Sequence, residues 1–320
     1  MSFHALVHPS IKDQHFSKHP KIHASKNIFF LILRHKKYFS QNDIILCFGN
    51  LPPILRYSCK TFVYFHNRLL LKPPKNLSLA AFLKIKLQQL YIHICLRNAD
   101  EYLLQTDEML TLFQDRFQDT SLRLAPFYDY RAPNHLYQKE NIKFDFIYVS
   151  DFYPHKNHQL LLSALKLLAE EHISPRVLFV IGQKTSLAEQ FKSSVQDSSN
   201  HLPMNITIMF DQSRFEIQQH YSDSLCLAWS SSSESFGMPL IEACRSNIYI
   251  IGPDLPYLND LLEIDKNLQF ELSKKSLAKA LKYFLLNYRE GGIQKPILKN
   301  KIYRTEEILE ALKNDNFSLN

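Results

Sequence analysis

Short runs of β-branched and aromatic residues alternate with helical patterns from Phe144 onward, and this alternation constrains the fold more than any other feature of the chain. Each run is followed by a segment with helical periodicity. Such repeated strand–helix units predict a parallel sheet with helices on both faces, so we expect a doubly wound α/β domain. The runs are FDFIYVS (144–150), RVLFVIG (176–182), NITIMF (205–210), SLCLAWS (224–230) and NIYIIG (247–252).

The first part of the chain shows a weaker version of the same pattern. DIILCFG (43–49), TFVYFH (61–66) and EYLLQ (101–105) are expected as strands, with helices after Pro53, over about 78–97 and from Thr106. Two doubly wound domains that face a cleft are the simplest arrangement. We expect a basic acceptor-side domain over 1–125, a linker rich in Pro and Asn over 126–143, and a ligand-binding domain over 144–300. A last helix, within 301–320, is expected to cross back to the first domain.

Composition excludes several classes of protein. With 45% hydrophobic and 22% charged residues, the 320-residue chain is not disordered. Unbroken apolar runs are short, so no membrane span is expected, and the N-terminus lacks the pattern of a signal peptide. We therefore expect the chain to stay in the cytosol. The five cysteines show no Cys-x-x-Cys spacing, which favours reduced, buried thiols and indicates no metal.

Charge is unevenly distributed along the chain. Residues 1–100 hold 15 Lys and Arg against three acids, a balance of +12, and the remainder has 23 against 28, or −5. No acid occurs between Asp43 and Asp100. Such a surface attracts anions, and nucleic acid and anionic lipid headgroups would both satisfy it. Residues 77–100 read as a helix that is apolar around most of its circumference, with Lys84 and Lys86 at one end. A buried helix with a basic edge and a membrane-surface helix both fit.

Three loops that follow strands and precede helices are candidates for chemistry, because ligands bind at the C-terminal ends of parallel strands. They are SDFYPHKNH (150–158), IGQKT (181–185) and SSSESFGMP (231–239). In the third loop, Pro239 suits the first helical position and Gly237 permits close approach of the backbone. Free amides of Phe236, Gly237 and Met238 would then suit a phosphate or diphosphate.

Two glutamates flank these amides. We expect Glu242 in the first turn of the helix, where it could accept from a sugar hydroxyl, and Glu234 in the loop, nearer the reacting group. As an alternative, the serines form a plain helix cap and Glu242 complements the helix dipole. A glycosidase-like acid and nucleophile would need two carboxylates opposed across one bond, which this spacing does not offer.

Other candidates are single residues. Gly182 allows a strand-to-helix turn to approach a ligand, but it is equally well explained as a turn glycine, and Lys184 adds charge there. His66 ends a predicted strand and is the best histidine for the cleft, although a strand-end histidine is more often structural. His155 and His158 are spaced like metal ligands on a helix but have no third ligand, so we interpret them as loop and cap residues.

Two of these segments carry a resemblance to a known family. ESFGMPLIEA (234–243) resembles the Glu-x7-Glu motif of retaining glycosyltransferases of family four, which have the two-domain GT-B fold. FIYVSDFYPHKNHQLLLSAL (146–165) looks like the strand–loop–helix that opens their donor domain. The resemblance covers about residues 144–290. FGNLPP (48–53) and YPHKNH (153–158) are similar, more narrowly, to bacterial surface-polysaccharide or lipooligosaccharide transferases of that family.

The resemblance implies a mechanism and a set of roles. Lys156 and the amides from Phe236 to Met238 would hold the leaving diphosphate, Glu234 would contact the hydroxyls of the donor sugar, and Glu242 would contact the ribose. His66 would lie beside the acceptor or the donor sugar. The donor would be a nucleotide-diphosphate sugar, with no metal or other cofactor, and the reaction would proceed with retention. We expect a lipid-linked or surface-polysaccharide acceptor and an anionic inner-leaflet membrane as partners, with the protein peripheral on the cytoplasmic face.

The chain also departs from the family pattern. Ser150 and Asp151 stand where many relatives have Gly-Arg, and the glycine-rich loop near the N-terminus is missing, since the first of six glycines is Gly49. The opening 40 residues do not read as a first strand and loop, which indicates a shortened or diverged N-terminal domain. A non-catalytic, degenerate glycosyltransferase acting as a partner or regulatory subunit is therefore the alternative. A nucleic-acid binder would explain the basic half but not the paired motifs, so no nucleic acid is expected.

Overall fold

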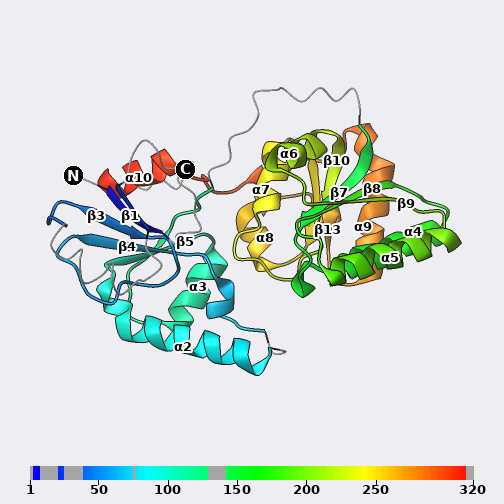
Figure 1. Cartoon of the computed structure of the whole chain (residues 1–320). Helices are drawn as coiled ribbons and strands as arrows, with labels where there is room; N and C mark the ends of the chain where they lie inside the picture. The colour runs from blue at the N-terminus through cyan, green and yellow to red at the C-terminus, as the bar shows by residue number, and fades with distance from the viewer. Residues whose placement is uncertain (1–2, 8–20, 25–38, 75–76, 129–141, 315–320) are drawn as a thin grey trace. The chain divides into compact units, whose positions relative to one another are not determined.

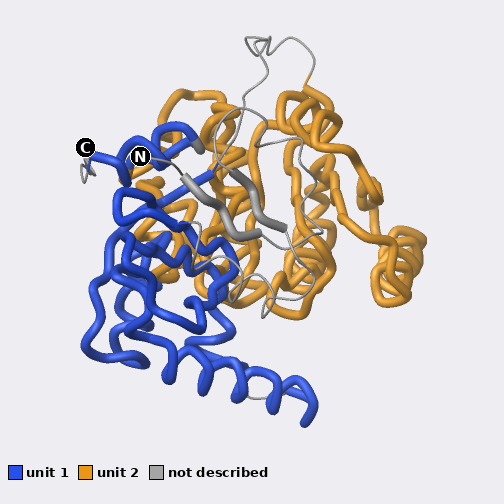
Figure 2. The backbone as a smooth tube through the Cα atoms, turned by 60° about the vertical axis from the view of Figure 1, so that its left-hand side comes forward, with its two compact units in different colours: residues 1–129, 301–320 blue, residues 130–300 orange. Residues whose placement is uncertain are grey.

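The computed structural model describes residues 3–7, 21–24, 39–74, 77–128 and 142–314. The chain divides into two compact units, unit 1 (1–129 and 301–320) and unit 2 (130–300), which Figure 2 colours blue and orange. Each unit is built on a six-stranded sheet (Figure 1), and every strand pairing within these two sheets is parallel. The predicted parallel α/β architecture is confirmed.

Unit 1 has the strand order β2-β1-β3-β4-β5-β6, one of the two common doubly wound arrangements. Its strands are β1 (Phe3–Val7), β2 (Lys21–Ala24), β3 (Ile44–Cys47), β4 (Lys60–Phe65), β5 (Glu101–Leu104) and β6 (Leu122–Leu124). Its helices are α2 (Leu79–Cys95), α3 (Asp107–Arg116) and α10 (Thr305–Asn314), with short 3-10 turns η2 (Arg68–Leu70) and η3 (Leu96–Asn98).

The core of unit 1 lies on both faces of its sheet, as the period of two along each strand requires. In β4, Val63 and Phe65 pack into a cluster with residues of α2 and α3, including Ile92 and Phe113. The alternate residues of β4 pack into a second cluster with Tyr303 and with Ile308 and Leu312 of α10. Helix α10, from the C-terminal end of the chain, therefore covers the second face of the first sheet.

Three expectations for unit 1 need correction. The opening stretch does hold a first strand, because β1 pairs with both β2 and β3; FHALV was missed because no glycine loop follows it. No helix follows Pro53, since the side chains of Tyr91 and Asn98 hold the carbonyls of Pro52 and Pro53 in an irregular segment.

The start of the expected linker also belongs to unit 1. Tyr128 is buried there, and the amide of Phe127 donates to the Tyr64 hydroxyl at 3.1 Å. Phe127 also bridges to Tyr303 just before α10, so residues 126–128 anchor the return of the chain. Residues 129–141 of the expected linker lie outside the described residues, and Lys143 at its end belongs to unit 2, where its amide donates to the Asp223 carbonyl at 2.8 Å.

Unit 2 has the strand order β13-β11-β10-β7-β8-β9, which is the doubly wound order 6-5-4-1-2-3 counted from β7. Its sheet strands are β7 (Phe144–Ser150), β8 (Arg176–Ile181), β9 (Asn205–Phe210), β10 (Ser224–Ala228), β11 (Tyr249–Pro253) and β13 (Gln269–Phe270); β12 (Leu262–Glu263) and β14 (Ile297–Leu298) form a small antiparallel pair. Its helices are α4 (His158–Glu170), α5 (Ser186–His201), α6 (Arg214–Ser222), α7 (Met238–Arg245), α8 (Pro256–Leu261) and α9 (Lys274–Asn287). The connection order reverses between β7 and β10, and such a switch point is where open α/β sheets bind ligands.

Helix α2 corrects the expectation that no stretch is long enough to cross a membrane. The helical segment Leu79–Asn98 has 20 residues and a mean hydropathy of 1.2, so its length and composition alone would allow it to span a bilayer. The sequence search missed it because Lys84 and Lys86 interrupt the apolar run.

Candidate functional site

The loops after β7 and β10 meet at the switch point of unit 2 and are joined by the serine run. The Ser230 hydroxyl donates to the carbonyls of Lys156 (3.2 Å) and Asn157 (3.1 Å), and the Ser232 amide donates to the carbonyl of His155 at 2.7 Å. The Ser231 hydroxyl also reaches the His155 carbonyl, at 3.2 Å. The serines therefore fix the Lys156 loop against the Glu234 loop instead of capping a helix.

Lys156 and Glu234 form an ion pair across these loops. The Lys156 Nζ lies 2.7 Å from Glu234 Oε1, and the two side chains are 14% and 10% exposed. A cation and an anion so shielded from water interact more strongly than a surface pair. The ammonium group has three donors, so the ion pair leaves donors on Lys156 for a further anion.

A fully buried tryptophan lies beneath this lysine. The Nζ of Lys156 sits 4.9 Å from the centre of the Trp229 ring, a cation–π distance. Trp229 in turn stacks on Tyr148 of β7, with ring centres 5.3 Å apart. The Tyr148 hydroxyl donates to the carbonyl of Lys156, and burial raises its pKa. The Trp229 ring therefore supports the side chain of Lys156, and the Tyr148 hydroxyl fixes its backbone carbonyl.

His158 begins α4 directly after this loop and is an interior residue. It is 2% exposed, its Nε2 lies 3.1 Å from Ser150 Oγ, and its ring centre lies 4.5 Å from that of Phe152 and 4.9 Å from that of Tyr148. Burial, with the nearby charge of Lys156, lowers the pKa of His158 to about 3, so its ring is neutral. The cap position belongs to Asn157, so the interpretation of His158 as a cap residue was wrong. His155 stacks with Tyr153.

The third loop ends at the N-terminus of α7. Gly237 is the N-cap residue with φ +75°, a left-handed conformation that disfavours other residues. A Cβ there would also lie 2.8 Å from Leu240 Cδ1. The Phe236 side chain is buried, whereas that of Met238 is exposed. Pro239 has no N–H and the Leu240 amide donates to the Gly237 carbonyl at 2.9 Å, so the amides of Phe236, Gly237 and Met238 are the ones that suit an anion at this helix end.

Glu242 is the fifth residue of α7, just past the first turn in which it was expected. Its Oε2 accepts a hydrogen bond from the hydroxyl of Tyr221 at 3.1 Å. Tyr221 is fully buried at the end of α6, so it fixes the direction of the partly exposed carboxylate. Asn247, just after the C-cap residue Ser246, has φ 51°, a left-handed conformation that turns the chain away from the helix.

Gly182 follows β8, the strand next to β7. A Cβ on Gly182 would lie 1.9 Å from Asp151 Oδ1, so the glycine makes room for the aspartate of the Lys156 loop. Lys184 is exposed and pairs with Glu189 at 3.2 Å. The carboxylate of Asp151, not a cation, therefore occupies this side of the loop.

His66 belongs to unit 1, directly after β4. Its amide donates to Asn50 Oδ1 at 2.6 Å, and its Nε2 lies 3.3 Å from Asn50 Nδ2. Asn50, in the FGNLPP segment after β3, has φ 65°. Burial lowers the pKa of His66, which leaves its ring neutral near pH 7. The neighbouring ends of β3 and β4 thus present a histidine that is oriented by an asparagine.

Comparison with known proteins identifies the family of unit 2. The family model described as "Glycosyl transferases group 1" matches residues 131–297, more than half of the chain. The chain belongs to this family.

Curated relatives of this group 1 glycosyltransferase match over short segments. It is 29% identical over 125 residues to the O-antigen chain mannosyltransferase RfbU of Salmonella typhimurium, a match that covers 39% of this chain and 33% of the relative. It is 26% identical over 153 residues to the serotype-specific mannosyltransferase WbdA of Escherichia coli, over 46% of this chain and 18% of the relative. The matches thus span a third or less of these relatives.

Solved structures resemble the whole group 1 chain. A glycosyltransferase from Rickettsia africae has a TM-score of 0.63 at 16% identity, over 99% of this chain and 94% of the other. Anabaena Alr3699/HepE in complex with UDP and glucose has 0.63 at 12% identity, over 91% of both chains. The pneumococcal O-GlcNAc transferase GtfA in complex with UDP and GlcNAc has 0.61 at 17% identity, over 90% of this chain and 59% of the other. These likenesses establish the GT-B fold.

Sequence reasoning missed the residues that support the site. Trp229 and Tyr148 lie inside strand patterns and read as core, and Tyr221 is separated from Glu242 by a strand and a loop. The sequence did indicate a special role for the serines, because a helix cap needs only one of the four consecutive serines that follow the strand.

Proposed function

We propose that this protein transfers a sugar from a nucleotide-diphosphate sugar to a lipid-linked or surface-polysaccharide acceptor, with retention of anomeric configuration and without a metal ion. The observation that carries the proposal is the shielded Lys156–Glu234 pair on Trp229, at the switch point between β7 and β10. The names of the curated relatives support mannose as the first sugar to test.

We assign the diphosphate to the positively polarised groups of the site and the sugar hydroxyls to its two carboxylates. The Lys156 ammonium and the amides from Phe236 to Met238 would stabilise the negative charge that develops on the leaving diphosphate. Glu234, held by Lys156, would accept from hydroxyls of the donor sugar, and Glu242, held by Tyr221, from those of the ribose. The diphosphate would therefore lie against Lys156 and the amides, with the sugar toward Glu234 and the ribose toward Glu242.

The proposed reaction balances without an enzyme nucleophile. The bond between the anomeric carbon and the diphosphate oxygen breaks, and the acceptor oxygen bonds to that carbon on the same face. The proton of the acceptor hydroxyl passes to an oxygen of the leaving diphosphate. His66, neutral through burial, would contribute a polar contact to the acceptor or the sugar.

One observation favours the alternative, a non-catalytic partner subunit. Asp151 stands where the family resemblance places an arginine, and its carboxylate lies over Gly182. A negative charge there would oppose a diphosphate. The alternative predicts that the site binds no nucleotide sugar.

Release of nucleoside diphosphate tests the proposal. UDP-, GDP- and ADP-linked sugars, mannose first, are incubated with the full chain and bacterial lipid-linked acceptors, with and without a chelator. We expect one donor to release its nucleoside diphosphate, at a rate that the chelator does not change. The anomeric coupling constant of the product should indicate the same anomeric configuration as in the donor.

Two variants assign the activity to the site. Glu234→Gln should lower turnover by about 10²-fold or more. Glu171→Gln, an exposed glutamate of unit 2 that pairs with Lys282, is the matched control and should keep wild-type turnover. Equal turnover of Glu234→Gln and Glu171→Gln would show that Glu234 does not contact the donor sugar in the reaction. A product with the opposite anomeric configuration to the donor would contradict retention.

A further inference from the structure

Helix α2 of unit 1 has two apolar faces, and only one is covered within the described part of the chain. Ile85, Ile92 and Cys95 are buried against the core of the unit. The exposed face carries Leu79 (74% exposed), Leu83 (52%), Leu87 (67%), Leu90 (55%) and Ile94 (71%). Figures 1 and 2 draw α2 along the margin of unit 1, with the rest of the unit on one side of it.

The exposed residues form one continuous line, here called the α2 stripe: Leu79, Leu83, Leu87, Leu90 and Ile94. Their spacing of four, four, three and four residues keeps them on the same side of an α-helix. At about 100° per residue the centre of the stripe lies roughly 180° from the buried residues. Side chains that are not needed for the core therefore repeat with helical periodicity, which random exposure of single leucines does not produce.

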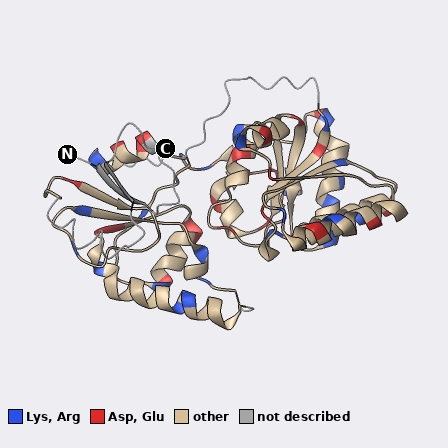
Figure 3. Cartoon of the chain, in the orientation of Figure 1, with Lys and Arg blue, Asp and Glu red and all other residues tan. Residues whose placement is uncertain are grey.

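The two charged residues of helix α2, Lys84 and Lys86, are both positive. They are exposed on the two sides of the α2 stripe, and the Nζ of Lys86 lies 5.4 Å from the ring centre of Phe82. Helix α2 holds no acid, and Figure 3 shows blue but no red along it. An apolar stripe between lysines matches a surface whose interior is apolar and whose edge is anionic.

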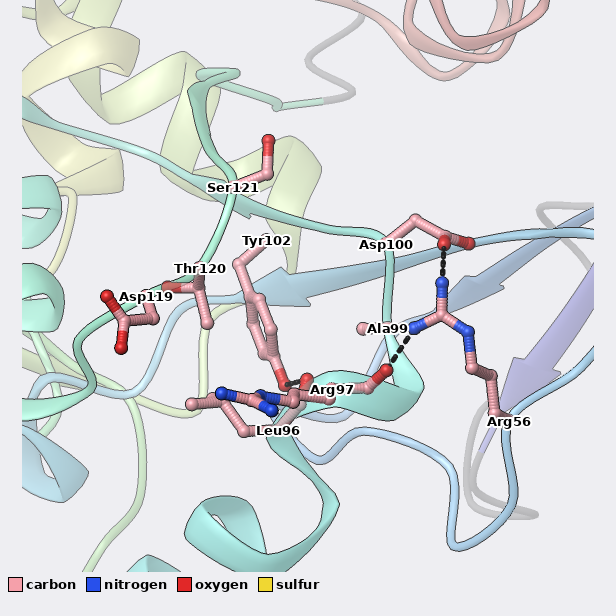
Figure 4. A pocket seen from close by; sticks show the side chains of 9 residues that line it. All are labelled: Arg56, Leu96, Arg97, Ala99, Asp100, Tyr102, Asp119, Thr120 and Ser121. Carbon is pink, nitrogen blue, oxygen red and sulfur yellow. Dashed lines mark hydrogen bonds and ion pairs between the residues drawn. The ribbon is translucent and has the colours of Figure 1, made fainter.

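A hollow that contains two arginines adjoins the C-terminal end of the stripe. It has a volume of about 420 Å³, and its lining includes Ile94 of the stripe, Arg97, Arg116 and one acid, Asp119. Arg97 also borders a second hollow of about 340 Å³, drawn in Figure 4, where dashed lines join Arg56 to Asp100 and to the backbone carbonyl of Arg97. Arg56 is thus neutralised by Asp100, whereas among the described residues no ion pair involves the side chain of Arg97.

The helix fits a position along a membrane better than one across it, despite its length. The Gln89 side-chain amide donates to the carbonyl of Leu70 at 2.8 Å and accepts from Arg116. Tyr91 donates to Pro52 at 2.9 Å. A spanning α2 would break these bonds and strip Ile92 from the core of unit 1.

We propose that α2 is the surface by which this protein docks on an anionic lipid bilayer, lying in the plane of the interface. The α2 stripe enters the boundary between headgroups and acyl chains, and Lys84, Lys86 and Arg97 contact headgroup phosphates. This inference rests on unit 1 alone and does not depend on the donor site of unit 2.

Vesicle co-sedimentation of the full chain tests the proposal. The probes are vesicles of phosphatidylcholine alone and of phosphatidylcholine with 30% phosphatidylglycerol, at low and at high salt. We expect binding to the anionic vesicles that declines with salt. The Lys84→Gln/Lys86→Gln variant should bind them roughly thirtyfold more weakly.

The apolar contribution needs its own variant. Leu83→Gln/Leu87→Gln/Leu90→Gln, all on the exposed face, should bind anionic vesicles at least about a hundredfold more weakly. Leu187→Gln/Leu286→Gln changes exposed leucines of unit 2 and should bind like the wild type. Circular dichroism checks that each variant is folded.

Four outcomes would overturn the proposal. Equal binding to neutral vesicles refutes the role of charge, and unchanged binding of the triple leucine variant refutes the role of the α2 stripe. Absence of vesicle binding by the wild type refutes the membrane as partner. Self-association that the triple leucine variant abolishes, in the absence of vesicle binding, would assign the stripe to a second copy of the chain.

Discussion

Replacement of Lys156 by methionine separates its role in stability from its role in catalysis. Methionine keeps the length of the side chain over Trp229 but leaves the Glu234 carboxylate, 10% exposed, without its cation. Loss of one partner of a buried pair costs about 3 kcal/mol. For a unit of this size, with a urea dependence of about 2 kcal/mol per molar, the unfolding midpoint should fall by about 1.5 M.

The double variant Lys156→Met/Glu234→Gln supplies the control. It removes both charges, so most of the lost stability should return, because no isolated carboxylate remains. Turnover should not return: Lys156→Met and the double variant should both be about 10²–10³-fold slower than the wild type, since neither has the cation that faces the diphosphate.

Urea unfolding followed by tryptophan fluorescence measures this effect, because Trp229 is the single tryptophan and reports unit 2. A double variant no more stable than Lys156→Met would show that the uncompensated Glu234 carboxylate is not the cause of the lost stability. Wild-type turnover in Lys156→Met would refute the assignment of the lysine to the diphosphate.

Three further predictions concern unit 2. Because burial lowers the pKa of His158, the unfolded chain takes up a proton at this residue at a higher pH than the folded chain does. The free energy of unfolding should therefore be full above pH 6.5 and fall by about 1.4 kcal/mol per pH unit as the pH drops from 6 toward 4. In acid urea titrations, His158→Phe should flatten this slope and leave the smaller slope of His220, whose pKa burial also lowers. An unchanged slope would remove His158 as its source. Gly237→Ala should destabilise unit 2 by about 1–2 kcal/mol and weaken donor binding, whereas Gly292→Ala, with open space around it, should have little effect; equal unfolding midpoints would contradict the strain at Gly237. Tyr221→Phe should weaken nucleotide binding roughly fivefold in calorimetric titrations, because Glu242 loses its donor, and unchanged affinity would show that Tyr221 does not position the carboxylate.

Much of the fold was predictable because parallel strands buried on both faces leave continuous apolar runs. From FDFIYVS to NIYIIG these runs coincide with β7 to β11. The strand β1 was not predictable from FHALV, because its place in the sheet depends on pairing with β3, a contact between distant residues. The return of the last helix to the first domain was expected from its helical pattern, and α10 packs there with residues of β3 and β4.

The candidate site was predictable only where local sequence carries the chemistry. The lysine and glutamates come from motifs at loop ends, and the assigned roles of these residues remain predictions. The support of Lys156 by Trp229 and Tyr148, and of Glu242 by Tyr221, arises from strand order and helix packing, which spacing along the chain does not reveal.

Ligand-observed NMR with UDP-, GDP-, ADP- and CMP-linked sugars, without added metal, tests the central claim most directly. The account predicts selective binding of one nucleotide sugar to the wild type, retained by the control variant Glu171→Ala and lost or strongly weakened in Glu242→Ala. Absence of binding by every donor, or equal binding by wild type and Glu242→Ala, would contradict a donor site between β7 and β10.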